Sequence, residues 1–179
     1  MPRPRRRRKP YRAWWVFWRV PILLAIVSAG WWFFYRPYVE EQGWTRQTGR
    51  FVVCGEPWRG AAGCVVDGDT IAMGSSNTPG TGTRRIRLTG FDAPELGGAC
   101  PAEREQAERA RRALLEWLSQ GPFEWSGEDS PPRDQYGREL REVRRILPDD
   151  RREYLAETMI ARGLAGESGW GATPVDWCA

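Results

Sequence analysis

Two stretches decide how this chain is expected to fold: residues 65–70 read VVDGDT and residues 87–95 read RLTGFDAPE. Each combines an apolar, strand-like run with acidic side chains, and an arginine lies between them. If the two runs pair in a sheet, the carboxylates of Asp69, Asp92 and Glu95 converge on one place. Clustered carboxylates repel one another, which raises their pKa values until a cation neutralises them. Oxygen ligands favour calcium or magnesium, and an adjacent arginine indicates a phosphate as the second ligand.

The charge of the chain is unevenly distributed. Its 179 residues include 27 basic and 23 acidic side chains, a formal net charge of +4. Nine basic residues and no acidic residue lie at or before Arg36, which leaves 18 basic against 23 acidic residues beyond it, a net charge of −5. The overall charge of this later segment therefore does not favour nucleic-acid binding. The absence of histidine excludes histidine-based catalysis, and the cysteine spacing does not match a zinc finger.

The N-terminal segment predicts a membrane anchor. Residues 1–12 form an arginine-rich tail, and residues 20–35 carry no charge. Aromatic side chains flank this apolar run at both ends, as in the interfacial belts of a membrane span. A spanning helix needs about 20 residues, so residues 13–35 suffice if Arg19 extends to the headgroups. Pro21 falls in the first turns, where it costs least. The excess of basic residues predicts a cytoplasmic N-terminus.

A cleaved signal peptide is the alternative, with Val27-Ser28-Ala29 as the cleavage site. The apolar run continues to Tyr35, which favours an uncleaved anchor. Both alternatives export the rest of the chain. The sequence thus predicts a bacterial-type, single-pass inner (plasma) membrane protein with a periplasmic or extracellular domain. Residues 36–48 are expected to be a linker and residues 49–179 the exported domain, and nothing indicates a protein partner.

The exported domain mixes strand-like and helix-like segments, so an α+β fold is expected. Strands are expected over residues 49–54, 84–88, 123–126 and 140–146, and over residues 64–66, resuming over residues 70–73 after an Asp-Gly-Asp turn. A loop rich in glycine, serine and threonine is expected over residues 74–83. Helices are expected over residues 101–119, where Pro101 suits the first position, and over residues 152–162, where Gly163 follows as a stop.

Four cysteines allow three disulfide pairings, and an exported domain lies where disulfides persist. Cys54 and Cys64 lie on consecutive strand-like runs across one turn region, which makes them natural neighbours. Cys100 and Cys178 would then pair and tie the C-terminal tail to the start of the first helix of the domain. Closing such a long loop adds roughly 4 kcal/mol in the chain-entropy description.

Three segments resemble the staphylococcal nuclease (thermonuclease) family: residues 66–70, residues 87–95 and the motif Asp134-Gln135-Tyr136-Gly137-Arg138. Residues 159–165 are similar to the end of a later helix in that family, so the resemblance covers about residues 49–165. It implies a five-stranded OB-type β-barrel with packed helices. It also implies calcium-dependent hydrolysis of phosphodiester bonds in DNA or RNA with little sequence preference.

The resemblance implies a role for each acidic position of the two opening stretches. Asp69, Asp92 and the main-chain carbonyl of Ala93 correspond to the calcium ligands of the family. Asp67 corresponds to a residue behind these ligands. Glu95 corresponds to the residue that activates or orients the attacking water, and the match does not decide between these two roles.

The resemblance also implies the groups that contact the substrate. Arg87 and Arg138 correspond to the two arginines that hold the phosphate, and Tyr136 corresponds to a tyrosine near the nucleotide phosphate. The chain departs from the family at Gln135, where a lysine would add a phosphate contact. It also lacks a second nucleotide-contacting tyrosine after residues 164–165. These departures predict weak, salt-sensitive binding of the substrate.

Two other functions fit the same residues. One is a catalytically weak binding module, because OB barrels commonly bind oligonucleotides and a fold alone does not fix a function. The other is a structural or interaction protein of the cell envelope, in which the acidic cluster binds calcium only for stability. All five positions expected to act in catalysis or metal binding are present, which favours the enzyme: Asp69, Asp92, Glu95, Arg87 and Arg138.

Overall fold

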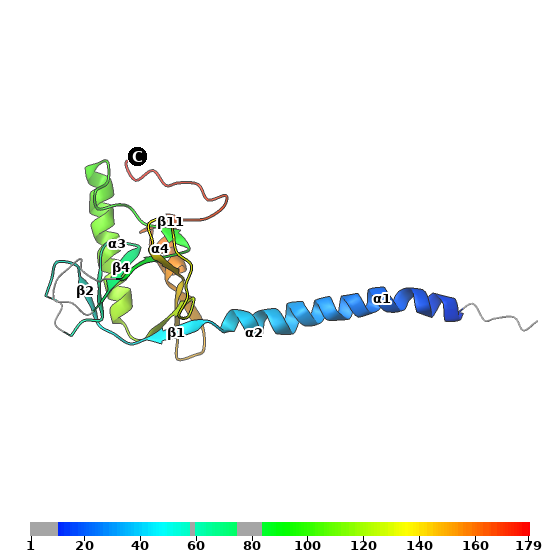
Figure 1. Cartoon of the computed structure of the whole chain (residues 1–179). Coiled ribbons are helices and arrows are strands. Elements are labelled where there is room, and N and C mark those ends of the chain that lie inside the picture. The colour runs from blue at the N-terminus through cyan, green and yellow to red at the C-terminus, as the bar shows by residue number, and fades with distance from the viewer. Residues whose placement is uncertain (1–10, 58–59, 75–83) are drawn as a thin grey trace, which may run out of the picture. The chain divides into compact units, whose positions relative to one another are not determined.

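A computed structural model describes residues 11–57, 60–74 and 84–179 (Figure 1). The chain divides into two compact units, Met1–Gly43 and Trp44–Ala179. The basic tail predicted for residues 1–12 and the loop predicted for residues 74–83 lie almost entirely outside the described residues. Both therefore stay predictions.

The first unit is helical. α1 spans Tyr11–Gly30, the π-helical segment η1 spans Trp31–Tyr35, and α2 spans Arg36–Glu41. The stretch Phe17–Val39 is long and apolar enough to cross a membrane, and its large apolar side chains are exposed. A signal sequence near the N-terminus can meet the same criteria of length and apolar composition. The predicted helix is confirmed, and the choice between an anchor and a signal peptide stays a prediction.

The linker predicted for residues 36–48 is largely structured. The helix continues to Glu41 and stops before Gly43, whose φ of +87° lies in the left-handed region that favours glycine. Strand β1 spans Trp44–Gln47, and strand β7 spans Phe123–Ser126. The two strands pair antiparallel, so the linker prediction was wrong here. A tertiary contact explains the difference: the Arg144 guanidinium lies 4.0 Å from the ring centroid of Trp44.

The described residues of the second unit form three sheets. The five-stranded sheet has the order β2-β3-β4-β5-β8, with bounds Phe51–Val53, Gly63–Val65, Thr70–Met73, Arg84–Leu88 and Glu139–Arg141. The four-stranded sheet has the order β1-β7-β9-β10, where β9 spans Val143–Ile146 and β10 spans Arg152–Tyr154. A small third sheet pairs β6 (Phe91–Asp92) with β11 (Gly166–Glu167). These pairings do not close into a barrel among the described residues.

Two helices cover the sheets, which confirms the α+β class. α3 spans Pro101–Ser119, as predicted, and α4 spans Leu155–Ala161. The second helix was expected to begin at Arg152, but residues 152–154 pair with β9 as β10 instead. The apolar face of α3 packs into the core, where the rings of Trp117 and Phe123 lie 6.0 Å apart. Other large, fully buried core side chains are Phe91, Ile71, Ile86, Leu88, Leu114, Leu155, Met159 and Val65.

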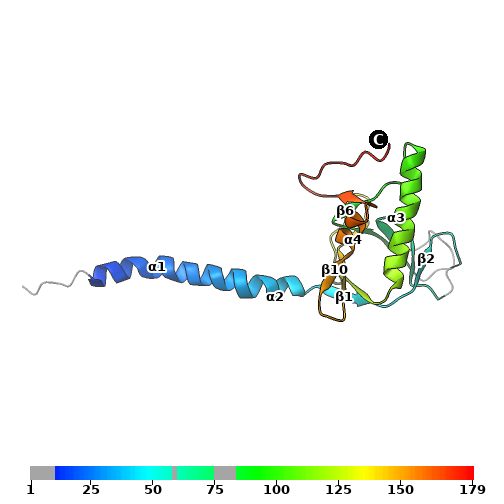
Figure 2. The same cartoon turned by 180° about the vertical axis from the view of Figure 1, so that it is seen from behind.

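Both predicted disulfides are present. Cys54 bonds to Cys64 on the neighbouring strand, with the Cα atoms 4.9 Å apart. Cys100 bonds to Cys178 across 78 residues of sequence, with the Cα atoms 6.0 Å apart. Cys100 is the N-cap residue of α3, and Figure 2 shows the C-terminal tail returning to this end of the helix. The second bond therefore ties the tail to the start of α3.

Candidate functional site

A tight turn between β3 and β4 carries the first acidic residues of the site. The Asp69 amide donates to Asp67 Oδ1 at 3.2 Å, which closes the turn. A Cβ atom on Gly68 would lie 2.6 Å from Ala93 Cβ and 2.8 Å from Ala110 Cβ. Glycine therefore lets the turn pack directly against the segment after β6 and against α3. This close packing buries the side chain that follows.

The Asp69 carboxylate is only 2% exposed by residue and is surrounded by donors. Its Oδ1 accepts from Thr70 Oγ1 at 2.9 Å and from Arg87 Nη1 at 3.1 Å. Its Oδ2 accepts from the Ala93 amide at 3.3 Å. Burial, followed by repulsion from Asp67, raises the pKa of Asp69 to about 7, although its donors act in the opposite direction. The donors around the Asp69 carboxylate therefore do not offset the effect of its burial.

Arg87 connects the two motif stretches, residues 65–70 and residues 87–95. Its strand places it directly opposite Thr70 in the β4–β5 register. Its Nη2 lies 3.0 Å from Asp69 Oδ2 and also forms an ion pair with Asp92. Asp92 is 61% exposed at its side chain, so this half of the cluster faces solvent. Of the three carboxylates predicted to converge, Asp69 and Asp92 both contact Arg87, and no contact among the described residues joins Glu95 to them.

Glu95 is exposed to solvent, and the charges of Asp67, Asp92 and Arg87 act on its carboxylate. None of the described residues donates a hydrogen bond to its carboxylate. Partial burial raises its pKa, and repulsion from Asp67 and Asp92 adds to this, while Arg87 and Arg138 act in the opposite direction. The carboxylate is therefore close enough to feel the whole cluster, and it is free to contact a solvent molecule.

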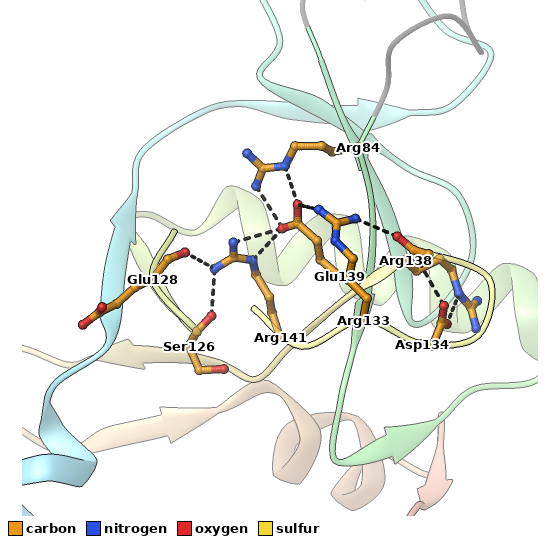
Figure 3. Close-up of polar contacts among 9 residues, drawn as sticks. Arg84, Ser126, Glu128, Arg133, Asp134, Arg138, Glu139 and Arg141 are labelled. Atoms are coloured by element: carbon orange, nitrogen blue, oxygen red, sulfur yellow. Dashed lines mark hydrogen bonds and ion pairs between the residues drawn. The ribbon is translucent and has the colours of Figure 1, made fainter. Parts of the chain in front are cut away.

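Arg138 and Tyr136 lie on the turn that precedes β8. Asp134 Oδ1 accepts from the main-chain amides of both residues at 2.9 Å, and its Oδ2 accepts from Arg138 Nε at 2.6 Å (Figure 3). The guanidinium carbon of Arg138 lies 5.5 Å from the centroid of the Tyr136 ring, which is highly exposed. Asp134 thus holds Arg138 on its own turn. The charge of Arg138 acts on Glu95, but no described contact joins Arg138 to Asp69 or Asp92.

The oxygen ligands of the site are of the type that a hard cation prefers. Asp67, Asp69 and Asp92 offer only oxygen atoms, as calcium requires, and a cation would offset the burial and the repulsion from Asp67 that raise the pKa of Asp69. Within the described part of the chain, no three carboxylates bring one oxygen each within 4.8 Å of one another. The Arg87 guanidinium lies between two of the carboxylates instead. The residues therefore fit a calcium ion by chemistry, and a bound ion would share the carboxylates with Arg87.

A second cluster of charges was missed in the sequence. Glu139 is 3% exposed, and it pairs with three arginines: Arg84, Arg133 and Arg141 (Figure 3). The signal was the alternation of Glu139 and Arg141 on one face of a strand whose neighbours pack in the core. Alternation with the apolar Leu140 favours exposure of these two charged residues, and one partner of Glu139, Arg84, lies 55 residues away in sequence.

Comparison with protein-family models finds no match, and a search of curated proteins finds no significant match. The resemblance to the staphylococcal nuclease family therefore rests on the motifs quoted above and on the cluster that they form.

Proposed function

We propose that the chain is a nuclease of the staphylococcal nuclease type that hydrolyses phosphodiester bonds in DNA or RNA with little sequence preference. The single observation that carries this proposal is the cluster of Asp69, Arg87 and Asp92, with Glu95 at its open edge. The cluster combines oxygen ligands for a cation, a guanidinium for a phosphate and a carboxylate for a water molecule.

An OB-type barrel is the proposed framework. An OB fold is a partly open Greek-key barrel of five strands. The antiparallel series β3–β4–β5 and the parallel pairs β2–β3 and β5–β8 give a five-stranded sheet that supports this proposal. The site lies where β4 begins and β5 ends, next to the turn before β8.

The proposed reaction needs a base and positive charge. The oxygen of a water molecule attacks phosphorus, and the bond from phosphorus to the leaving ester oxygen breaks. Glu95 orients that water or accepts its proton, and the leaving oxygen takes a proton from solvent. A raised pKa brings Glu95 closer to neutrality, where a general base is most effective. Negative charge grows on the phosphate oxygens, and Arg87 and Arg138 stabilise it.

Asp69, Asp92 and the carbonyl of Ala93 would hold the calcium ion, with Asp67 behind them. When bound, calcium supplies positive charge beside the phosphate and neutralises the ligating carboxylates. The Arg87 guanidinium already pairs with both aspartates, so it is placed to pair with a phosphate at the same point. Asp134 orients the Arg138 guanidinium in the same way from the neighbouring turn.

The test is hydrolysis of single-stranded DNA and RNA by the full chain in neutral detergent, with calcium or with a chelator. We expect cleavage only with calcium, and a strong loss in Glu95→Gln and Arg138→Ala. Arg109→Gln, an exposed arginine of α3, is the matched control and should cleave normally. The proposal fails if the wild type and the two site variants show the same background rate.

One observation favours a binding module as the second candidate. Both proposed phosphate-binding arginines already pair with aspartates of the chain, which would weaken their action on a substrate. Tight binding of an oligonucleotide without turnover would support this candidate. If calcium raised the melting temperature and nucleotides had no effect, a structural role in the envelope would be favoured instead.

The proposed location is outside the cytoplasm, with the N-terminal helix as a single-pass anchor and the N-terminus in the cytoplasm. The length and composition of Phe17–Val39 support a membrane span, and two disulfides support an oxidising compartment for the domain. Protease added to intact spheroplasts should digest the domain. Protection of the domain until the membrane is opened would contradict this orientation.

A further inference from the structure

The cluster around Glu139 carries more positive than negative charge. The Glu139 carboxylate pairs with Arg84 Nε at 2.9 Å, Arg133 Nη2 at 3.2 Å and Arg141 Nη2 at 2.9 Å. Arg141 is 3% exposed, and its Nη1 donates to two main-chain carbonyls, so its donors are used inside the protein. One carboxylate against three guanidinium groups leaves a local charge of +2.

This excess charge lies on two side chains that reach solvent. The side chains of Arg84 and Arg133 are 52% and 55% exposed. Glu139 engages Nε and Nη2 of Arg84, and no described residue accepts a hydrogen bond from its Nη1. In the same way, no described residue accepts from Nε of Arg133. A guanidinium group that is held on one side and open on the other is well prepared to bind a phosphate.

The cluster lies on the other face of the strands that carry the candidate site. Neighbouring residues of a strand point to opposite faces, and Ile86 pairs with Glu139 while Arg87 pairs with Leu140. Arg84 therefore shares the Glu139 face, and Arg87 lies on the opposite one. β8 is the last strand in the order of its sheet, and beyond it the segment that carries Arg133 forms an isolated bridge with Glu139, so this segment and its turn form the edge between the two faces.

The turn before β8 connects the two faces. Arg133 begins this turn and Arg138 ends it, and the Asp134 amide donates to the Arg138 carbonyl at 3.0 Å across its base. Arg133 Nη1 also donates to the Gly137 carbonyl at 2.7 Å (Figure 3). A polyanion that reaches Arg138 on one side of the turn therefore meets Arg133 on the other side.

We infer that Arg84 and Arg133, held by the buried carboxylate of Glu139, form a second phosphate-binding site for the backbone of a single nucleic-acid strand. The inference rests on the proposed nuclease function and specifies how a long substrate is bound. The segment beyond Arg36 has a net charge of −5, so a local excess of +2 is the opposite of its surroundings. A nucleic-acid strand that runs from Arg138 around the turn of residues 133–138 would place a further phosphate on this site.

The experiment compares oligonucleotides of about 4 and about 16 nucleotides, the range of strand lengths bound by one OB fold. The full chain in neutral detergent carries Glu95→Gln in every sample, so that the strand stays intact. Fluorescence anisotropy gives the affinity at several salt concentrations for the reference protein, for Arg84→Gln, for Arg133→Gln and for the double variant. The control is Arg109→Gln with Arg112→Gln, which removes the same charge from the exposed face of α3.

Each phosphate contact with a single strand contributes about 0.7 to the slope of log affinity against log salt. We expect the slope for the long oligonucleotide to fall by about 0.7 in each single variant and by about 1.4 in the double variant. The advantage of the long over the short oligonucleotide should shrink accordingly, and the control should keep both slope and advantage. Each single variant leaves Glu139 with two arginine partners, which preserves the buried pairing.

Three results would overturn the inference. An equal loss for short and long oligonucleotides would mean that Arg133 acts only by holding the turn of Arg138. The second site would be rejected if the variants had the same slopes as a reference protein that binds the oligonucleotide. The proposed nuclease function would be kept in that case if the protein with Glu95 restored cleaves. The site would be assigned to lipid if binding of fluorescent phosphatidylglycerol in mixed micelles required Arg84 and Arg133 while the variants bound oligonucleotides as tightly as the reference protein. A reference protein that binds no oligonucleotide would reject the proposed function itself.

Discussion

The two charge clusters of the domain combine the same residue types in opposite proportions. Around Arg87, the aspartates Asp67, Asp69 and Asp92 outnumber one guanidinium group. Around Glu139, three arginines outnumber one carboxylate. In each cluster, the single group of one sign contacts several groups of the other sign. The sign of the excess charge determines whether the cluster favours a cation or an anion as its ligand. The first cluster lacks a cation, and the second lacks an anion.

The clusters also differ in where the excess charge lies. In the aspartate cluster, part of it lies on Asp69, which is buried, and this burial, followed by repulsion from Asp67, raises the pKa of Asp69 to about 7. In the arginine cluster, the buried pair of Glu139 and Arg141 is balanced, and the excess lies on half-exposed side chains that water solvates. Burial of the excess charge makes the aspartate cluster responsive to metal and pH. Exposure of the excess makes the arginine cluster a contact surface.

The largest expected effect separates chemistry from binding. Glu95→Gln keeps the size of the side chain but removes its basicity, so we expect kcat to fall by roughly 10²- to 10⁴-fold. Hydrolysis of a short single-stranded DNA with saturating calcium measures this. Glu105→Gln, on the exposed face of α3, is the matched control. A kcat within a factor of about three of the wild type would remove Glu95 from the chemistry and leave water orientation to other groups.

The second prediction tests burial in the arginine cluster. Glu139→Leu leaves Arg141 buried without its carboxylate partner, so the free energy of unfolding should fall by about 3–5 kcal/mol. Asp92→Asn also removes one ion-pair partner, but an exposed one, and should change stability by less than about 1 kcal/mol. Urea unfolding followed by tryptophan fluorescence gives both values. Equal effects of the two substitutions would show that the clusters do not differ in burial.

The third prediction uses the raised pKa of Asp69. A carboxyl group whose folded pKa is about 7, above its unfolded value near 3.9, binds more protons in the folded state between these values. The free energy of unfolding should therefore fall as pH rises from about 4 to about 7, by at most about 1.4 kcal/mol per pH unit. Urea unfolding with a chelator present measures this contribution as the difference between the wild type and Asp69→Asn. A difference that is constant over this range would contradict the raised pKa.

Local sequence patterns predicted the structure correctly where the residues that meet in space also belong to recognisable motifs. The stretches around Asp69 and Arg87 were expected to pair, and the register places Thr70 opposite Arg87. The disulfide between Cys54 and Cys64 followed from adjacent strand-like runs. α3 was predicted with its bounds because its start residue, its apolar stripe and the glycine beyond it all agree.

Long-range contacts explain what the sequence did not reveal. β1 has only four residues, and its pairing partner lies about eighty residues later. β10 replaces the first turn of a predicted helix because it pairs with β9. Glu139 meets Arg84 across 55 residues of sequence, and nothing in the periodicity of either strand indicates this pairing. Helix and strand propensities are weak compared with such tertiary contacts.

The last prediction tests which cluster responds to a cation. Calcium that binds only the folded protein should raise the free energy of unfolding by about 2.7 kcal/mol at one hundred times its Kd. Asp69→Asn with Asp92→Asn removes both charged ligands, so this stabilisation should vanish. Arg84→Gln with Arg133→Gln lies on the opposite face of the strands and should retain it. If both double variants lost the stabilisation equally, the calcium response would come from the domain as a whole. The opposite charge excess of the two clusters would then not determine their ligands.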